Sequence, residues 1–461
     1  MIELAVLVSF FVIALTLGDW RRGLLAILVL GVLQDVFRKL TPGVPGYYLV
    51  WGTAMFGVTI AVAYANGAVR RLRPLYLYDP RLKAAWGIYF LVVLAQVGHA
   101  WVRWGNPQVP LLGLVFYLGP IAALLVGVAY ANSERRITTY LTAYILIMAP
   151  AVLTVYLSLE YSDQWPVLRD IGTFAGGQLI IFDQGVALES YAGILRTGEI
   201  AAWHAATAAA FLIMLATRNP SLAFRIVAGL MVVALVGAII LTGRRKMLMT
   251  LTIFLTVQWA LLIFLHKGVT RQTLTLLMLG VVGSFAFTLL DPQEQASESD
   301  LYLQRGVTVF ADVGGRVQTA LNLLESALAR SSGIGLGAGI ASQGMAHVEG
   351  RMAAKAIGGS SEAGLGKVVV ELGIPGALAI LWLLYCLALR MWQGLRLLGR
   401  ASESLSYYAA SFAALLIANI ATFAVATQVY GDHVILLLLG LVAGMLCSLA
   451  MAGIELGAER R

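Results

Sequence analysis

Charged residues and cysteines are both scarce in this chain, and each scarcity excludes a class of protein. Only 12% of the 461 residues are charged, whereas 60% are hydrophobic and the mean hydropathy is +0.84. A water-soluble domain could not cover so much apolar surface with so few polar side chains. The two cysteines, Cys386 and Cys447, lie inside apolar runs, so no disulfide framework is indicated and the redox compartment stays undetermined. The composition therefore indicates an integral membrane protein.

The cations make the chain basic, with a pI near 9.5 and a formal net charge of +8. They are scattered rather than gathered in a patch with interleaved aromatic residues, so nothing indicates nucleic-acid binding. Loop cations of this kind meet anionic lipid headgroups. The first apolar run, Met1–Leu17, lacks the basic start and the cleavage site of a signal peptide, and we expect it to be retained as a helix.

Apolar runs suited to crossing roughly 30 Å of hydrocarbon recur along the whole sequence. Thirteen can be delimited: Met1–Leu17, Gly23–Val36, Tyr47–Tyr64, Ala85–Val97, Leu111–Ala131, Ile137–Leu159, Ile200–Ala216, Phe224–Thr242, Met247–Leu265, Leu274–Leu290, Val368–Met391, Tyr407–Val429 and Val434–Ile454. The second and fourth are short, which leaves tilted or re-entrant segments open. We expect residues 1–461 to form a single integral membrane domain, an all-α polytopic helical bundle of about 12–13 transmembrane helices.

Two long polar segments, Glu160–Glu199 and Asp291–Lys367, interrupt this series, and the distribution of Lys and Arg predicts where they lie. One side collects about eighteen cations: Arg21, Arg22, Arg70, Arg71, Arg73, Arg81, Lys83, Arg135, Arg136, Arg218, Arg225, Lys267, Arg271, Arg390, Arg396, Arg400, Arg460 and Arg461. The short connections on the other side hold about six. Because cations concentrate on the cytoplasmic side, loops 160–199 and 291–367 are predicted to be external.

The turn "LTGRRKM" is an exception to this distribution. Arg244, Arg245 and Lys246 are half of the cations in the short external connections. One interpretation is that they anchor a helix end among lipid headgroups. The other is that they bind an anion, because a guanidinium forms two parallel hydrogen bonds to a phosphate and stays charged at any relevant pH. A lipid diphosphate is the natural anion at that depth.

Further polar residues are expected on the same side of the membrane. Arg196 and Glu199 open the seventh apolar run in "SYAGILRTGEIAAWHAA". Glu362 stands just before the eleventh run, and Glu371 lies about two turns inside it. Together with the arginine turn, these residues could form one site at the external edge.

The second long loop carries "GGRVQTALNLLESALARSSGIGLGAG". The first part predicts an amphipathic helix with Leu321, Leu324 and Leu328 on one face. The alternating glycines are not a dinucleotide or phosphate fingerprint, since no strand precedes them. They predict a tight backbone turn.

These features, in this order, resemble the O-antigen ligase and polymerase superfamily, the Wzy-like enzymes that move glycans from undecaprenyl diphosphate on the outer face of the bacterial inner membrane. Members show an arginine and a glycine opening a central span, here Arg196 and Gly198, and an arginine turn between the next two spans, here Arg244 and Arg245. A long external loop then carries an arginine helix, here with Arg316, and a GxGxG turn, before a span that opens with "ELGIPG". The resemblance covers roughly residues 191 to 376 and implies a GT-C-like helical bundle with the large loop, itself containing helices, over the site.

One position departs from the family pattern. Many members carry a His-Asn pair about nine residues before the Glu of "ELG", and that histidine is the proposed general base. This chain has Glu362 followed by Ala363 there. A carboxylate can do the same work in a partly dry site. His347 is an alternative base, and Glu362 could instead form a structural pair with an arginine.

The resemblance implies a membrane glycosyltransferase of the bacterial inner membrane with its active site facing the periplasm. An acceptor sugar hydroxyl attacks the anomeric carbon of a glycan on undecaprenyl diphosphate, and Arg196, Arg244, Arg245 and Arg316 neutralise the leaving diphosphate. No His, Asp and Glu cluster with metal-ligand spacing appears in the external segments, so we expect no metal and no cofactor.

The acceptor is a second lipid-linked glycan in a polymerase, and lipid A core or a protein in a ligase. The residues do not separate these activities, although the atypical base favours a polymerase narrowly. A polymerase could also work with a chain-length regulator. Either activity belongs to polysaccharide or lipopolysaccharide biosynthesis.

Three further residues are candidates for substrate binding. Glu199 lies near Arg196, and His204 lies one turn further along, although a histidine hydrogen-bonded within the bundle is an equal alternative. His433 follows Asp432 in the short external turn "YGDHV", which lies over the site or is only a polar connector.

A secondary transporter or flippase for a lipid-linked glycan is the alternative function. Such proteins place charges and broken helices near the midplane of pseudo-symmetric halves. Here the notable charges gather at the external edge and the halves do not look alike, which favours the transferase.

Overall fold

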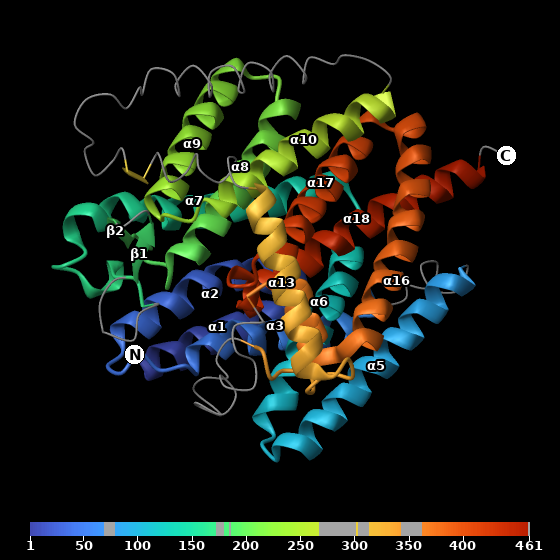
Figure 1. The fold of residues 1–461 in the computed structure, drawn as a ribbon. Helices are drawn as coiled ribbons and strands as arrows, with labels where there is room; N and C mark the ends of the chain where they lie inside the picture. The colour runs from blue at the N-terminus through green and yellow to red at the C-terminus, as the bar shows by residue number, and fades with distance from the viewer. Residues whose placement is uncertain are drawn as a thin grey trace.

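The computed structural model describes residues 1–68, 79–171, 179–183, 186–266, 301–302, 313–342 and 362–459. Within these ranges the chain forms thirteen α-helices and one antiparallel pair of strands (Figure 1). Ten of the described helices are long and apolar enough to cross a membrane. The protein is therefore an all-α, multi-pass membrane bundle, as the sequence predicts.

Helices occupy twelve of the thirteen expected runs. They are α1 (Ile2–Gly18), α2 (Trp20–Leu40), α3 (Tyr48–Ala65), α5 (Pro80–Trp104), α6 (Gln108–Tyr130), α7 (Glu134–Tyr161), α8 (Gly198–Arg218), α9 (Leu222–Leu241), α10 (Lys246–His266), α16 (Gly364–Ala401), α17 (Glu403–Val425) and α18 (His433–Glu459). The remaining run, Leu274–Leu290, lies outside the described residues.

The two runs that looked short are continuous helices, of 21 residues in α2 and 25 in α5. Helix α5 is among the ten that are long and apolar enough to cross a membrane, whereas α2 is not. Local signals extend α5 beyond its apolar centre. The Asp79 side chain accepts from the N–H groups of Arg81 and Leu82, and Pro80 occupies the first position. Gly105 ends the helix in the left-handed conformation.

Small residues allow the central helices to pack closely. The apolar window of α8 is 83% buried. Between α6 and α18, a Cβ on Gly127 would lie 2.2 Å from the Leu441 carbonyl oxygen, and one on Gly444 would lie 2.0 Å from the Leu124 carbonyl oxygen. Such contacts are the usual means by which helices associate where lipid weakens the hydrophobic driving force.

Polar contacts group the helix ends at two ends of the bundle. At the end called the site end below, Lys39 of α2 donates to the Gly193 carbonyl at 2.7 Å, and Lys246 of α10 donates to Gln428, which follows α17. These contacts join connections that the sequence places on one side.

The opposite end is formed by the other connections. Ser404 donates to Glu134 at 2.5 Å, and Arg218 lies 3.9 Å from Glu403. The expected alternation of the spans is therefore consistent with these contacts, while the side of the membrane that each end faces stays a prediction.

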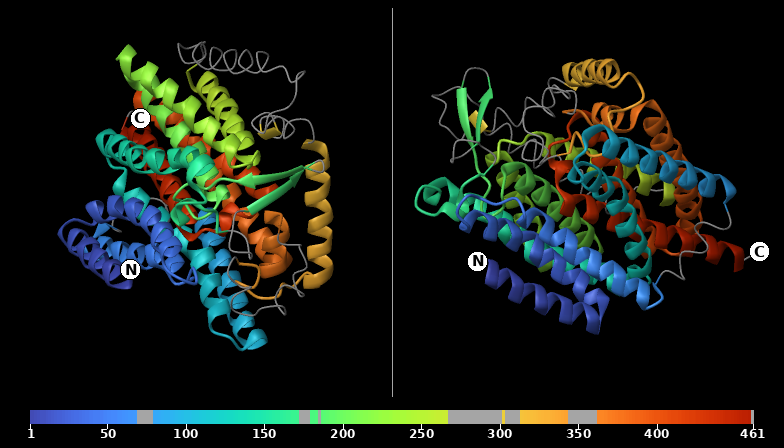
Figure 2. Two further views of the ribbon diagram at one scale, coloured as in Figure 1. Left: turned by 90° about the vertical axis from the view of Figure 1, so that its left-hand side faces the viewer. Right: turned by 90° about the horizontal axis from the view of Figure 1, so that it is seen from below.

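The two long connections add structure outside the spans. The first contains strands β1 (Leu179–Asp183) and β2 (Val186–Ser190), with Leu179 opposite Ser190, and the short helix η2 (Pro166–Leu168). The second contains α13 (Val313–Ser331). Both views of Figure 2 place the hairpin and α13 on the same side of the bundle.

Helix α13 confirms the predicted amphipathic helix, and only part of its leucine face is buried. Leu321 and Leu328 are 52% and 36% exposed. Ala327 is fully buried and Leu324 partly buried, in a cluster that includes Val369 and Val370 of α16. The reason is that α13 packs closely on α16 through a small residue, which turns the larger leucines away.

Candidate functional site

Arg196 lies at the site end, just before α8, between two aspartates. Its backbone N–H donates to Asp35 Oδ2 at 3.0 Å, its Nη1 lies 3.8 Å from Asp35 Oδ1, and its Nη2 donates to Asp432. Burial alone would raise the pKa of Asp432, but the Arg196 guanidinium, together with the hydrogen bond from the Ile435 N–H, holds that pKa below its ordinary value. Arg196 is thus already paired with two carboxylates, so its contact with a diphosphate stays a prediction.

Arg244 is positioned by Glu199. Its Nη1 lies 3.0 Å from Glu199 Oε1, and the two side chains are 13% and 18% exposed. The other two guanidinium nitrogens, Nε and Nη2, are buried and have no hydrogen-bond partner among the described residues. These two nitrogens form the edge of a guanidinium that binds an oxyanion with two parallel hydrogen bonds.

Leaving polar nitrogens buried and unpaired costs about 1–3 kcal/mol each. A protein retains such an arrangement where a ligand or water completes it. The turn that the sequence singles out therefore presents two buried, unpaired guanidinium nitrogens of Arg244 along one edge.

Arg245 and Lys246 continue the same turn, and both are half-buried. Lys246 Nζ donates to Gln428 Oε1 in the connection between α17 and α18. The neighbouring Thr427 donates to the Glu362 carbonyl through its N–H at 2.9 Å and its Oγ1 at 3.1 Å. The structure therefore brings Glu362, with an exposed side chain, to the same end of the bundle as the arginine turn.

Two of the sequence candidates cannot be placed. His347 lies outside the described residues. Arg316 is in the first turns of α13, but its side chain is not among those described. Their roles stay predictions.

His204 is a buried residue of α8, and its Nδ1 is 2.7 Å from the Tyr144 hydroxyl of α7. This contact matches the interpretation of a histidine hydrogen-bonded within the bundle. Nothing in the described residues assigns His204 to a substrate.

The predicted glycine turn is confirmed, with positive φ angles of 72°, 100°, 107° and 100° at Gly333, Gly335, Gly337 and Gly339. A Cβ on Gly337 would lie 2.6 Å from Ala100 Cα, and one on Gly339 would lie 2.0 Å from the Val109 carbonyl oxygen. Only glycine combines these backbone angles with so close an approach to α5 and α6.

Helix α16 is broken where this turn meets it, because Gly373 has φ 70° and ψ −172°. The N–H of Ile374 donates to the Gly333 carbonyl at 2.8 Å, and the N–H of Leu336 donates to the Val370 carbonyl at 2.7 Å. The turn thus pairs with backbone groups that the break leaves without helical partners, as irregular backbone within a membrane protein requires.

Glu371 of α16 is fully buried, and its carboxylate joins α6 and the end of the glycine turn to α16. Tyr117 donates to Oε2 at 2.5 Å, and the Ala341 N–H donates to Oε1 at 2.7 Å. Ser342 Oγ lies 3.4 Å from the same Oε1. The "ELGIPG" segment of α16 is therefore the part of the helix to which the glycine turn is hydrogen-bonded.

Two further basic side chains converge on Phe116 of α6. Lys367 Nζ lies 3.4 Å from the ring centroid, and the His433 ring contacts the same ring edge-to-face at 5.7 Å between centroids. Lys367 is only 4% exposed. His433 directly follows Asp432, the partner of Arg196, so this group adjoins the ion pairs around Arg196.

Comparison with known proteins does not place the chain in a family. No protein-family model matches the sequence, and no curated protein matches it. The resemblance to the O-antigen ligase and polymerase superfamily therefore stays a hypothesis, carried by the arginine turn and the segments around it.

Sequence reasoning missed several charged residues at the site end. Asp35 and Lys39 lie at the end of an apolar run and were not singled out, although charges in a span are a recognised signal. Asp170 accepts from the Gly198 N–H at 2.7 Å and so holds the start of α8. Lys367 was taken as the end of a loop, whereas it lies in the first turn of α16.

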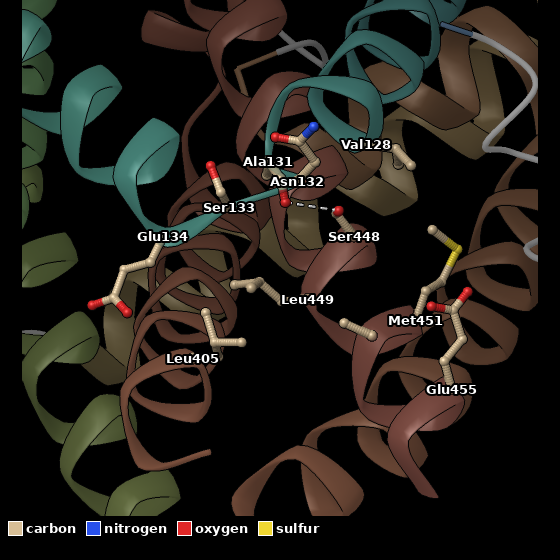
Figure 3. Close-up of a pocket in the computed structure, with 11 residues that line it drawn as sticks. Val128, Ala131, Asn132, Ser133, Glu134, Leu405, Ser448, Leu449, Met451 and Glu455 are labelled. Carbon is tan, nitrogen blue, oxygen red and sulfur yellow. Dashed lines mark hydrogen bonds between the residues drawn. The ribbon is translucent and has the colours of Figure 1, made fainter. Parts of the chain in front are cut away.

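The structure also has a cavity at the opposite end of the bundle. It has a volume of about 400 Å³ and lies between the α6–α7 turn, α17 and α18 (Figure 3). Ser448 donates to the Ala131 carbonyl at 2.9 Å, and the carboxylates of Glu134 and Glu455 lie on either side. None of the candidate residues lines it. Among the side chains that the structure describes, no three His, Cys, Asp or Glu residues come together as a metal site, and metal independence stays a prediction.

Proposed function

We propose that this protein is a membrane glycan transferase that moves an oligosaccharide from undecaprenyl diphosphate to an acceptor sugar hydroxyl. The observation that carries the proposal is the unpaired Nε–Nη2 edge of Arg244, held by Glu199 at one end of a membrane bundle. A buried, oriented guanidinium edge at the end of the helices suits the diphosphate of a lipid whose chain lies among them.

The chemistry follows from this placement. The acceptor oxygen forms a bond to the anomeric carbon as the bond from that carbon to the diphosphate oxygen breaks. The lipid diphosphate leaves with the bonding electrons, and Arg244 with its neighbouring cations stabilises that charge. Glu362 takes the proton of the acceptor hydroxyl, in keeping with the exposed position of its side chain near the arginine turn.

The test uses the purified full-length protein and a defined undecaprenyl-diphosphate oligosaccharide, with and without a second acceptor. A polymerase makes longer lipid-linked glycans from the donor alone, whereas a ligase acts only when lipid A core or a protein is added. The absence of any transfer to any of these acceptors would remove the proposal.

A flippase or secondary transporter is the second candidate, and the break of α16 at Gly373 is the observation that favours it, because discontinuous helices are common in transporters. The break is filled by the glycine turn, and the candidate charges lie at one end. A deletion strain separates the two functions. A lipid-linked precursor that accumulates outside supports the transferase, and one that accumulates inside supports the flippase.

A further inference from the structure

Lys367 combines deep burial with few polar contacts among the described residues. Only 4% of the residue is exposed, and no described hydrogen bond or ion pair involves its ammonium group. The Phe116 ring beneath Nζ offers a cation–π contact but accepts no strong hydrogen bond. An ammonium group has three donors, so its binding capacity is left unfilled.

The nearby carboxylates are already occupied by other donors. Glu371, one turn along α16, accepts from Tyr117, Ala341 and Ser342. Asp432 accepts from Arg196 and from the Ile435 N–H. Glu371 attracts the charge of Lys367, but no hydrogen bond or ion pair joins either carboxylate to Lys367 in the described structure.

His433 presents a second unfilled group to the same place. Its Nε2 is buried and has no hydrogen-bond partner among the described residues. Its ring contacts the Phe116 ring on which Lys367 lies. Two nitrogen-bearing side chains from α16 and α18 thus converge on one aromatic residue of α6.

The backbone adds positive potential at this point. Lys367 is the fourth residue of α16, whose N-terminus has no side-chain cap, and His433 begins α18. Unpaired N–H groups at a helix N-terminus favour an anion and disfavour a cation. A buried ammonium at this position is costly unless a negative ligand joins it.

We propose that Lys367 and His433, supported by Phe116, form a second anion-binding subsite that takes a carboxylate or phosphate group of the glycan substrate. The inference relies on the proposed function for the identity of the ligand. The shared chemistry is an oxyanion, whose source is either an acidic sugar or a phosphate of the donor. This subsite adjoins the ion pairs of Arg196, because His433 directly follows Asp432 in the chain.

The experiment measures thermal unfolding of the detergent-purified full chain at increasing concentrations of galacturonate, pyrophosphate or neutral glucose. Ligands that bind only the folded protein raise its unfolding temperature, and the rise grows with the logarithm of the ligand concentration divided by the Kd. Wild type is compared with Lys367→Met, Lys367→Gln and His433→Gln. Arg390→Gln, near the other end of α16, is the matched control.

We expect an anion to stabilise the wild type and Arg390→Gln, and the Lys367 variants to bind it about tenfold more weakly because a charge-assisted hydrogen bond is lost. His433→Gln weakens it less. Loss of galacturonate binding alone supports an acidic-sugar subsite, and loss of pyrophosphate binding alone supports a phosphate of the donor. Without ligand, Lys367→Met unfolds at the same or a higher temperature than wild type, because a buried unpaired charge is removed.

The inference is overturned if neither anion stabilises the wild type, if the Lys367 variants bind both anions like the wild type, or if they lose glucose binding equally. It is also overturned if Lys367→Met and Lys367→Gln both unfold without ligand, since the residue is then structural. Anion binding that depends on Lys367, in a protein that transfers no glycan, contradicts only the proposed function.

Discussion

At the scale of single residues, Arg244 is held by Glu199, a residue that the sequence places on the same side of the bundle. Glu199 is 45 positions from Arg244 in the chain, and no spacing rule connects them, so the pair at 3.0 Å appears only in the folded bundle. Arg196 was predicted to contact diphosphate, and the structure adds the two aspartates that already neutralise it. Asp35 is a charged residue within an apolar run, and that signal in the sequence could have identified it as a partner of Arg196.

Replacing Arg244 tests the anion-binding edge. We expect Arg244→Ala to reduce donor binding by about 1.5–3 kcal/mol and glycan transfer further, since charge on the leaving group grows in the transition state. Arg244→Lys should rescue poorly because an ammonium lacks the planar fork. Arg225→Ala, an exposed arginine at the opposite end, is the control. Wild-type transfer by Arg244→Ala would refute the role.

Replacing the proposed general base, Glu362, should affect turnover but not donor binding. Glu362→Gln should lower single-turnover transfer by about 10²–10⁴ while donor affinity persists, because glutamine cannot accept the proton. Glu362→His should retain partial activity, since histidine titrates near neutrality. Near-normal turnover of the glutamine variant would pass the role to His347.

The ion pair of Asp432 predicts a pH dependence of stability. Asp432→Asn should destabilise the protein by about 3 kcal/mol, since it removes a carboxylate from a buried guanidinium. The pKa of Asp432 is lowered in the fold, so its contribution is present above the ordinary value of 3.8 and is lost as the pH falls through the lowered value. Thermal unfolding between pH 7 and acid pH, with Asp163→Asn as control, should show the wild-type advantage shrinking in acid. An equal advantage at every pH would contradict this.

At the scale of elements, hydropathy predicted where helices form, because a span needs about twenty apolar residues whatever it packs against. It could not predict where they end or break. Asp79 and Gly105 extend α5 beyond its apolar run, and the break at Gly373 depends on a turn more than thirty residues earlier in the chain. The leucine pattern of α13 predicted an amphipathic helix, but it could not predict that the small residue Ala327 packs against α16.

The glycine turn gives a prediction at this scale. Gly339 and Gly105 both have positive φ, of 100° and 64°, but a Cβ would lie 2.0 Å from the Val109 carbonyl oxygen at Gly339 and meets nothing within 4 Å at Gly105. Gly105→Ala should therefore cost about 1 kcal/mol of stability, the conformational penalty alone. Gly339→Ala should cost several times more. If both variants lowered the unfolding temperature equally, the glycine turn would not be closely packed against α6.

At the scale of the whole molecule, composition was enough to predict an all-α membrane bundle, and the alternation of spans correctly grouped connections at common ends. The sequence placed Arg196, Glu199, Arg244, Glu362 and His433 at one edge, but it could not predict the contacts of Asp35 from α2 or of Lys367 with Phe116, because those depend on how the helices pack. The transferase activity and the periplasmic orientation of the site remain proposals.

The proposed use of arginines for the leaving group predicts that transfer needs no divalent metal. Glycan transfer by the purified protein should persist in excess EDTA, because Arg244 and its neighbours supply the positive charge. Loss of activity on chelation, with recovery in magnesium or manganese, would overturn this prediction.

The most direct test of the central claim is to measure the release of undecaprenyl diphosphate and the formation of the new glycan together. The purified wild-type protein and Arg244→Ala are compared on one defined donor with each acceptor. The account predicts equal amounts of both products from the wild type, and neither above background from the variant although it unfolds at the same temperature. Wild type that leaves the donor intact with every acceptor, or Arg244→Ala that matches it, would contradict the account.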